Sequence, residues 1–225
     1  MNSDEIASYL KSHPEFFERY AEMLSELNIP HPHGGRTISI SERQILALRD
    51  KGKQLETKLR EVIQFGEEND VVGRKIHTLS LALLRARDAA AVVQTVLTQL
   101  RGDFAVPQVA LRVWRAAPGA AAELPEFAAV SEATRAFANA LTKPGCGGEP
   151  AADTEVLFGG RAPQPGSYAY VPLRNAGDGS DNAVFGLLAL ASEDPRRYYE
   201  GMGTLYLSRV GDLIGCALAA HLPPA

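Results

Sequence analysis

The stretch Phe185-Gly186-Leu187-Leu188-Ala189-Leu190-Ala191-Ser192-Glu193-Asp194-Pro195 joins a continuous apolar run to a polar turn. An apolar run that ends in Ser-Glu-Asp-Pro is typical of a buried strand that stops at a loop, because proline cannot continue the hydrogen-bond ladder. Upstream, Ser167-Tyr168-Ala169-Tyr170-Val171-Pro172-Leu173-Arg174 predicts a second strand. The polar, glycine-containing segment 175–182 lies between them and predicts a hairpin turn. The sequence therefore predicts a sheet with this antiparallel hairpin in its core.

The bulk composition is that of a globular protein with room for one domain and an accessory segment. The chain has 225 residues, of which 45% are hydrophobic, and a net charge of −4. Its 23 Lys and Arg residues are spread along the sequence, so we expect no direct nucleic-acid binding. Residues 1–11 lack the basic and apolar regions of a leader peptide, and no window approaches the length of a membrane span. We therefore expect a cytoplasmic protein that does not contact membranes.

The two cysteines occur in different contexts. We expect no disulfide between them in a reducing cytosol. Cys216 belongs to an apolar helical pattern, which predicts a buried thiol. Cys146 lies in a glycine-rich segment that predicts a loop. A redox role for Cys146 would need a neighbouring cation to lower its pKa, and the sequence assigns none.

The first 35 residues carry two helical patterns and then a break. Ser3 and the acids after it predict the cap and first turn of a helix that ends before Pro14. A second helix that starts at Pro14 would carry an apolar face made of Phe16, Phe17, Tyr20, Met23, Leu24 and Leu27. So short a segment cannot bury this face by itself, so we expect helices 3–27 to dock on the other protomer or on a partner protein. Segment 28–35, with two prolines and two glycines, predicts a linker.

A long helix is expected to open with Ser41 as its cap and to carry a heptad seam. The seam consists of Ile45, Leu48, Leu55, Leu59 and Val62, with Gly52 in the remaining core slot. Such a seam on a charged helix needs a cover, so we predict a homodimer built on residues 41–65. The alternative is that the seam packs on the chain's own C-terminal domain. The next core slots hold Gly66, Asn69 and Gly73, which predict that the helix loosens or bends there.

From about residue 79 the pattern predicts an α+β domain with an antiparallel sheet flanked by helices. The expected helices are 89–100, 131–141 and 201–220. Besides the hairpin, the expected strands are 109–114, a segment near 123–130, and 155–158. The last helix is expected to bury Leu205, Leu213, Ile214, Ala217 and Leu218. Segment 143–166, rich in glycine and proline, is expected to be mostly loop.

The hairpin and several short motifs carry a resemblance to known families. The Val171-Pro172-Leu173 strand, its turn and the Phe185 to Leu190 run resemble the last hairpin of GAF domains, which are small sensory modules related to PAS domains. The whole chain resembles the DUF484 family through His13-Pro14-Glu15-Phe16-Phe17, Pro30-His31-Pro32-His33-Gly34-Gly35, Ser41-Glu42-Arg43-Gln44, Ser192-Glu193-Asp194-Pro195 and Gly201-Met202-Gly203-Thr204. This resemblance implies a helical N-terminal extension on a GAF-like domain, with no assigned reaction.

Three parts are therefore expected along the chain. Residues 1–35 form the N-terminal helical segment, residues 36–78 the long dimerisation helix, and residues 79–225 the GAF-like domain. The chain lacks the Asn-Lys-x-x-x-Phe-x-x-x-Glu pattern of the GAF domains that bind cyclic nucleotides in phosphodiesterases. It also has no cysteine placed for a bilin chromophore. The sequence therefore favours neither a cyclic nucleotide nor a bilin as the ligand.

Residues that would carry catalysis or hold a metal are isolated in this sequence. His31 and His33 share a loop but have no third or fourth ligand nearby, which favours a structural turn. An inter-helix hydrogen bond is the simpler role for His77. The sequence has no HExxH, GxSxG or Walker motif and no GxGxxG before a helix. We therefore expect no metal, no cofactor and no enzymatic activity.

Alternation along the strands defines a candidate ligand site. Successive side chains point to opposite faces of a sheet, and one face is expected to pack on helices through Val109, Leu111, Val113, Ala169, Val171 and Leu173. The opposite face would then carry Arg112, Trp114, Tyr168 and Tyr170 beneath the 143–166 segment, which includes Phe158. One cation among several aromatic rings fits a small anionic or aromatic molecule. Alternatively, these residues fill a closed core and Arg112 pairs with an acid.

Two functions remain open at this point. The first is a non-enzymatic GAF-like sensory or regulatory module that dimerises through its helices and passes a signal to a partner protein. The second is a ligand-free helical adaptor in which the GAF-like fold is a scaffold for protein contacts. Whether a small molecule occupies the site would discriminate between them.

Overall fold

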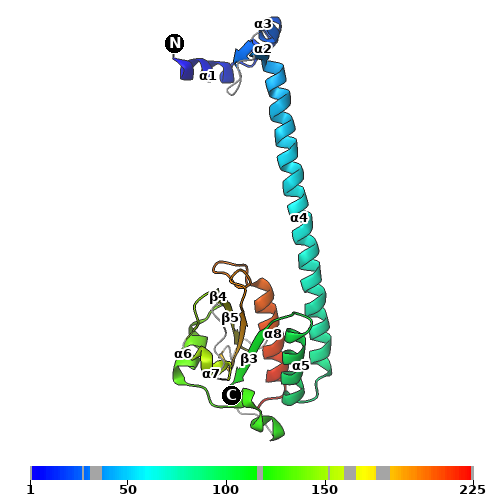
Figure 1. Cartoon of the computed structure of the whole chain (residues 1–225), viewed down its shortest axis with the longest axis vertical. Coiled ribbons are helices and arrows are strands. Elements are labelled where there is room, and N and C mark those ends of the chain that lie inside the picture. Colours follow the sequence, from blue (N-terminus) through cyan, green and yellow to red (C-terminus); the bar gives the residue numbers. More distant parts are fainter. Residues whose placement is uncertain are drawn as a thin grey trace. The chain divides into compact units, whose positions relative to one another are not determined.

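The computed structural model describes residues 2–26, 28–30, 37–115, 119–151, 153–159, 166–175 and 183–223. The chain divides into two compact units, Met1–Glu68 and Asn69–Ala225, whose elements are labelled in Figure 1. In the first unit the described residues form helices and one short hairpin. The second unit combines helices with a four-stranded antiparallel sheet. The α+β class that the sequence predicts is therefore confirmed.

The N-terminal helices differ in detail from the expected pattern. Helix α1 (Ser3–Ser12) ends before Pro14 as expected, but Asn2 is its cap in place of Ser3. The Asn2 backbone N–H donates to the Glu5 carboxylate at 2.9 Å, which satisfies a donor that the helix leaves unpaired. The expected second helix is divided into α2 (Glu15–Arg19) and α3 (Ala21–Glu26). The division falls at Tyr20, whose backbone leaves the helical conformation with φ −116°.

An aromatic cluster forms around Phe16. The ring centroid of Phe16 lies 5.9 Å from that of Phe17 and 4.8 Å from that of Tyr20. Phe17 and Tyr20 each remain 44% exposed, so the cluster does not bury this face within the unit. Beyond it, β1 (Asn28–Pro30), which begins the segment expected to be a linker, pairs with β2 (Thr37–Ser39), which lies just after that segment. The predictions made for Leu27, His31 and His33 lie outside the described residues.

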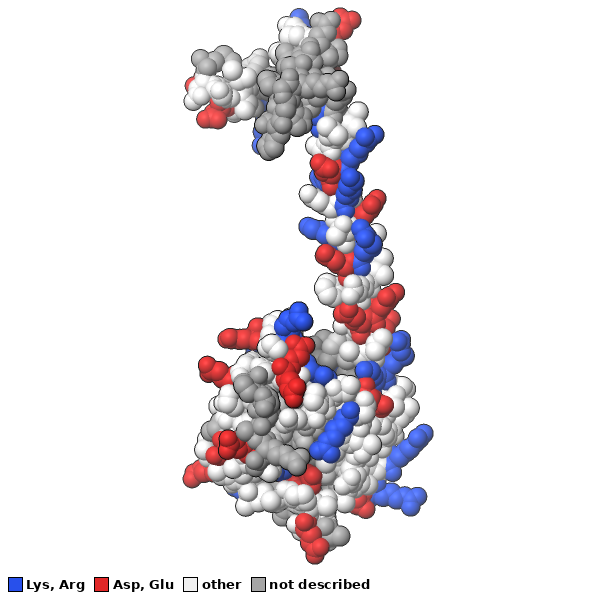
Figure 2. Space-filling model, in the orientation of Figure 1, with Lys and Arg blue, Asp and Glu red and all other residues white. Residues whose placement is uncertain are grey.

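The long helix α4 spans Ile40–Arg85. It starts one residue before Ser41, and it continues without a break through Gly66 and Gly73, where we expected it to loosen. Each glycine costs about 1 kcal/mol of helix propensity relative to alanine. The segment 40–85 contains no proline, which is the residue that would break the backbone hydrogen bonds of the helix, so two isolated glycines do not end it. Figure 2 shows basic and acidic side chains intermixed along this helix.

The sheet of the second unit has the strand order β3-β6-β5-β4. Its strands are β3 (Gln108–Val113), β4 (Gly145–Gly147), β5 (Ser167–Leu173) and β6 (Gly186–Ser192). The predicted hairpin of β5 and β6 occupies the two central positions, with Val171 opposite Leu188. Every residue of both strands is buried, as the continuous apolar run predicts. Residues 176–182 of the connecting turn lie outside the described part of the chain.

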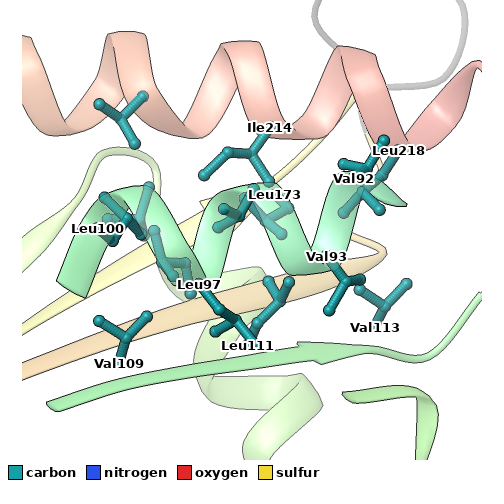
Figure 3. Close-up of a cluster of buried hydrophobic side chains, with 14 of the residues drawn as sticks. Val92, Val93, Leu97, Leu100, Val109, Leu111, Val113, Leu173, Ile214 and Leu218 are labelled. Carbon is teal, nitrogen blue, oxygen red and sulfur yellow. The ribbon is translucent and has the colours of Figure 1, made fainter. Parts of the chain in front are cut away.

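Helices cover both faces of this sheet (Figure 1). On one face lie α5 (Ala89–Arg101), α8 (Leu205–Ala219) and Leu79 and Leu83 from the end of α4. Figure 3 shows the side chains of α5 between α8 and β3. This cluster contains all six strand residues that the alternation predicts for the helix-covered face: Val109, Leu111, Val113, Ala169, Val171 and Leu173. The opposite face packs on α6 (Glu132–Ala140) and α7 (Thr154–Leu157).

Two of the expected strands are wrong. The segment near 123–130 contains the 3₁₀ turns η1 (Gly119–Glu123) and η2 (Pro125–Phe127). Pro125 sits at the first position of η2, where its fixed φ and missing N–H suit a helical turn and oppose a ladder. Residues 155–158 belong to α7 and its C-cap instead of a strand. The N–H of Leu157 donates to the Asp153 carbonyl at 2.9 Å, so local hydrogen bonds replace sheet pairing here.

Helix α8 approaches β5 closely through two glycines. A Cβ atom at Gly211 would lie 2.5 Å from Val171 Cγ1, and a Cβ at Gly215 would collide with the Arg174 carbonyl oxygen. This buried face also carries Ile214 and Leu218, both fully buried as expected. Other residues of the same helix are less buried than expected. Leu205 is 59% exposed, Cys216 is exposed, and Leu213 and Ala217 are half-buried, which corrects their expected burial.

We predict that Gly215→Ala lowers the free energy of unfolding by about 1–3 kcal/mol, because the added methyl group meets backbone that cannot rotate away. Thermal and urea unfolding followed by circular dichroism measure the change. Gly73→Ala in α4 is the matched control, since a Cβ atom added there would meet open space. That control should add up to about 1 kcal/mol through helix propensity. A Gly215→Ala protein as stable as the parent would contradict the close α8–β5 approach.

Candidate functional site

The sheet face that faces α6 and α7 carries the predicted aromatic residues. Tyr168 is 3% exposed and Tyr170 is 5% exposed, and their rings stack with centroids 6.2 Å apart. Phe137 of α6 meets the Tyr170 ring edge to face at 5.2 Å. Trp114 packs against the same cluster, and its indole N–H donates to the Val184 carbonyl at 3.1 Å. The strand alternation predicted for these residues is therefore confirmed, and protein side chains pack around them.

Hydrogen bonds fix Tyr170 beneath α7. Its hydroxyl accepts from the Ala151 N–H at 2.9 Å and lies 2.9 Å from Thr154 Oγ1. Thr154 Oγ1 also donates to the Ala151 carbonyl at 2.6 Å. Since Thr154 is 5% exposed, these are buried polar groups that need each other. The network ties the turn before α7 to the central strand β5.

A second polar group joins α7 to the start of α6. The hydroxyl of Ser131, the cap of α6, bonds to the Asp153 carboxylate and accepts from the Thr134 N–H at 3.0 Å. The Thr134 hydroxyl donates to the same carboxylate at 3.2 Å. Asp153 has a left-handed backbone with φ 62°, which turns the chain into α7. Residues 153–159 of the expected cover are therefore anchored to the domain at two places.

Arg112 sits apart from the aromatic rings, at the outer edge of the sheet. Its guanidinium donates to the Leu111 carbonyl at 2.9 Å and to the Val156 carbonyl of α7 at 3.3 Å. Burial lowers the pKa of this guanidinium, and the negative charge of Glu126 acts in the opposite direction. The group stays protonated because an arginine keeps its charge in proteins.

A cavity of about 450 Å³ lies beside this guanidinium. Its size falls in the range of small-molecule sites. It lies along β3, between the end of α5, η2 and the end of α7. The lining residues that bear on its chemistry are Leu97, Arg101, Arg112, Glu126, Leu157 and Phe158. The cavity therefore combines two cations and one acid with an apolar floor.

The predicted site residues are thus divided between two places. Arg112 and Phe158 line the cavity, whereas Trp114, Tyr168 and Tyr170 belong to the packed face around α6 and α7. Sequence reasoning missed Arg101 and Glu126. Both lie on elements whose position beside β3 depends on tertiary packing. Arg101 could have been considered from the sequence, since it lies at the end of a helix that was predicted correctly.

The predicted dimer seam lies on the exposed surface of α4. Its side chains are between 49% and 69% exposed: Ile45 49%, Leu48 69%, Leu55 59%, Leu59 60% and Val62 65%. Within the described part of the first unit, nothing covers this seam. The three- and four-residue steps between these positions match the core of a coiled coil. The seam is therefore an apolar surface with the geometry of a helix-pairing interface.

Cys146 and His77 differ in what surrounds them. Cys146 lies in strand β4 and not in a loop, and burial raises the pKa of its thiol. A raised pKa keeps the thiol protonated and less nucleophilic, which is unfavourable for a redox role. His77 is exposed on α4.

Among the residues that the structure describes, no group of three His, Cys, Asp or Glu could hold a metal ion. No helix among them is long and apolar enough to span a membrane.

The fold and these sites define an α+β protein with a sheet between two helical layers and a long N-terminal helix with an apolar seam. Comparison with protein families identifies it further. Residues 1–221 match the family described as "Protein of unknown function, DUF484", and the chain belongs to this family. The expected family membership is confirmed. A search of curated proteins finds no match.

We predict that Tyr170→Phe lowers the free energy of unfolding by about 1–3 kcal/mol, because it removes the acceptor of the Ala151 N–H and one of the two partners of the Thr154 hydroxyl. Chemical denaturation of the full chain measures this. Tyr199→Phe is the matched control, since Tyr199 is 56% exposed, and it should leave stability within about 0.5 kcal/mol. If both variants unfolded at the same denaturant concentration as the parent, the Tyr170 network would have no structural role.

Proposed function

We propose that this chain is a non-enzymatic, GAF-like regulatory module that works as a homodimer joined through α4. The observation that carries the proposal is the exposed apolar seam on α4. A helix that is isolated in water is only marginally stable, and most of its stability in a protein comes from packing its apolar face against another surface. A second copy of the same helix offers the complementary surface, since its seam has the same spacing. On this proposal, the module acts in the cytoplasm through protein contacts.

Charges beside the seam favour a parallel arrangement of the two helices. With Ile45 at position a, Lys51 occupies g and Glu56 occupies the following e. In a parallel dimer, Lys51 of one protomer meets the partner's Glu56, and the symmetric pair repeats the attraction. An antiparallel dimer pairs g with g and e with e, so the repulsion between Lys51 and Lys58 offsets the attraction between Arg49 and Glu56. Each exposed ion pair is worth only about 0.5 kcal/mol, so charge selects orientation and the seam supplies affinity.

The domain architecture supports the GAF-like part of the proposal. A GAF-like domain would place an antiparallel sheet between helices, and the second unit has this arrangement (Figure 1). Strands β5 and β6 are the two central strands of that sheet. Such modules act by passing on a change in conformation, without chemistry of their own. The partly exposed aromatic face of Phe17 and Tyr20 is proposed to dock on the other protomer or on a partner protein.

Small-molecule binding is a second candidate function, and the cavity beside Arg112 favours it. The ligand-free adaptor is the alternative within the same dimer. In its favour, Tyr168 and Tyr170 are packed under α6 and α7, so the described part of that face works as core. Both versions keep the dimer. They differ only in whether the cavity along β3 has an occupant.

The dimer is tested by sedimentation equilibrium of the full chain at tens of micromolar. We expect a mass of twice 24.2 kDa for the parent. The double variant Leu55→Asp, Leu59→Asp should sediment as one chain, because two buried charges in adjacent core layers cannot be satisfied. Gln54→Asp adds one negative charge on the neighbouring exposed helix surface and should remain dimeric. A parent mass of 24.2 kDa, or a dimer that survives the double variant, would contradict the proposal.

A further inference from the structure

Strand β3 is an edge strand, and only its inner side is paired among the described residues. The sheet order places β6 on one side of β3 and no described strand on the other. The Trp114 N–H donates to the Phe185 carbonyl across the β3–β6 ladder. Because backbone groups of a strand alternate in direction, residues 108, 110 and 112 face β6 as well. The N–H and C=O groups of Val109, Leu111 and Val113 therefore point outward, two of these residues along the wall of the cavity.

Two arginines donate hydrogen bonds to the outward carbonyls of this edge. Arg101 comes from α5, on one face of the sheet, and donates to the Val109 carbonyl at 3.3 Å. Arg112 is on β3 itself, has its side chain on the α7 side, and donates to the Leu111 carbonyl at 2.9 Å. The two guanidinium groups thus reach adjacent outward acceptors from opposite faces. Both also line the cavity.

The outward N–H groups have no such partner. Among the described residues, no hydrogen bond reaches the N–H of Val109 or of Leu111. The edge therefore presents backbone N–H donors and guanidinium donors together, while the carbonyl acceptors of Val109 and Leu111 are already engaged. An incoming β-strand needs both donors and acceptors in alternation. A ligand that only accepts hydrogen bonds needs donors alone, so the β3 edge suits an anion better than a peptide strand.

We propose that the cavity along the β3 edge binds a small organic monocarboxylate, with the carboxylate held by Arg101, Arg112 and the Leu111 N–H. A carboxylate has four acceptor positions and no donor, which matches this set of groups. Guanidinium groups bind carboxylates through short, charge-assisted hydrogen bonds. The single acid in the lining, Glu126, leaves a net charge of one positive unit, which one carboxylate neutralises. The apolar body of the ligand lies on Leu97, Leu157 and Phe158.

This site rests on the regulatory function proposed above and names its ligand class, but its test is independent of the dimer. The probe is 3-phenylpropionate, an aromatic monocarboxylate, and its neutral control is 3-phenylpropionamide. Binding to the isotopically labelled full chain is followed by nuclear magnetic resonance of the backbone amides. We expect saturable shifts at Val109 and Leu111 with the carboxylate and no binding of the amide. Equal binding of both probes, or no saturable binding of the carboxylate, would overturn the proposal.

Substitutions test which charged side chains hold the carboxylate. Arg101→Gln and Arg112→Gln should each weaken carboxylate binding about tenfold or more, the usual effect of losing a hydrogen bond between charged groups. Arg135→Gln on α6 is the matched control, since Arg135 is exposed and does not line the cavity, and it should bind as the parent does. If Arg112→Gln does not fold, Glu126→Gln still tests the site, because removing the one acid should tighten binding. Unchanged or weaker binding by Glu126→Gln would overturn the assignment. Sedimentation of the same samples reports the dimer separately.

Discussion

The second unit depends on one constraint, which is that both faces of the β5–β6 hairpin must be covered. Every residue of the two strands is buried, so neither face can be left to water. A strand with apolar residues on both faces forces a layer of helices above the sheet and another below it. The close approach of α8 at Gly211 and Gly215 builds one layer. The other is smaller and irregular, and the hydrogen bonds of Tyr170 hold it in place.

The first unit has the opposite property, because its apolar residues exceed what it can cover. The seam of α4 and the aromatic cluster around Phe16 both stay partly exposed in the described residues. Burial of apolar surface is the main favourable term in protein association, and each Å² that is buried contributes about 25 cal/mol. Uncovered surface of this kind therefore favours pairing with another copy. The second unit would then belong to a dimer held together by the first, which is the basis of the proposed regulatory role.

Sequence patterns predicted the parts of the fold that local periodicity controls. The central hairpin, α5 and the helical seam follow directly from the spacing of apolar residues. The predictions failed where short segments depend on tertiary partners. Residues 155–158 form part of a helical turn because Asp153 and Thr154 supply local hydrogen bonds, which a run of four residues does not reveal. Cys216 lies on the outer side of α8, since the adjacent Gly215 faces β5.

The candidate site was partly predictable for the same reason. Alternation placed Arg112 on the correct face of β3, but it could not show that β3 is the outermost of the described strands. Because β3 has this position, the Arg112 guanidinium lies at the edge of the sheet, where Arg101 of α5 also donates a hydrogen bond to β3. Edge position depends on strand order, which no pattern within one strand contains. The aromatic residues Tyr168 and Tyr170 were correctly grouped, and their neighbours on α6 and α7 make them part of the core.

The central claim, a parallel dimer through the α4 seam, is tested most directly by disulfide cross-linking at one core position. Leu48→Cys is introduced after Cys146 and Cys216 are replaced by serine, so that the new thiol is the only one. In a parallel coiled coil each core residue faces its own copy, so oxidation should give a covalent dimer in high yield. Asp50→Cys, on the outer surface of the same turn, should give little. Equal yields from the two variants, or no covalent dimer from Leu48→Cys, would contradict the account.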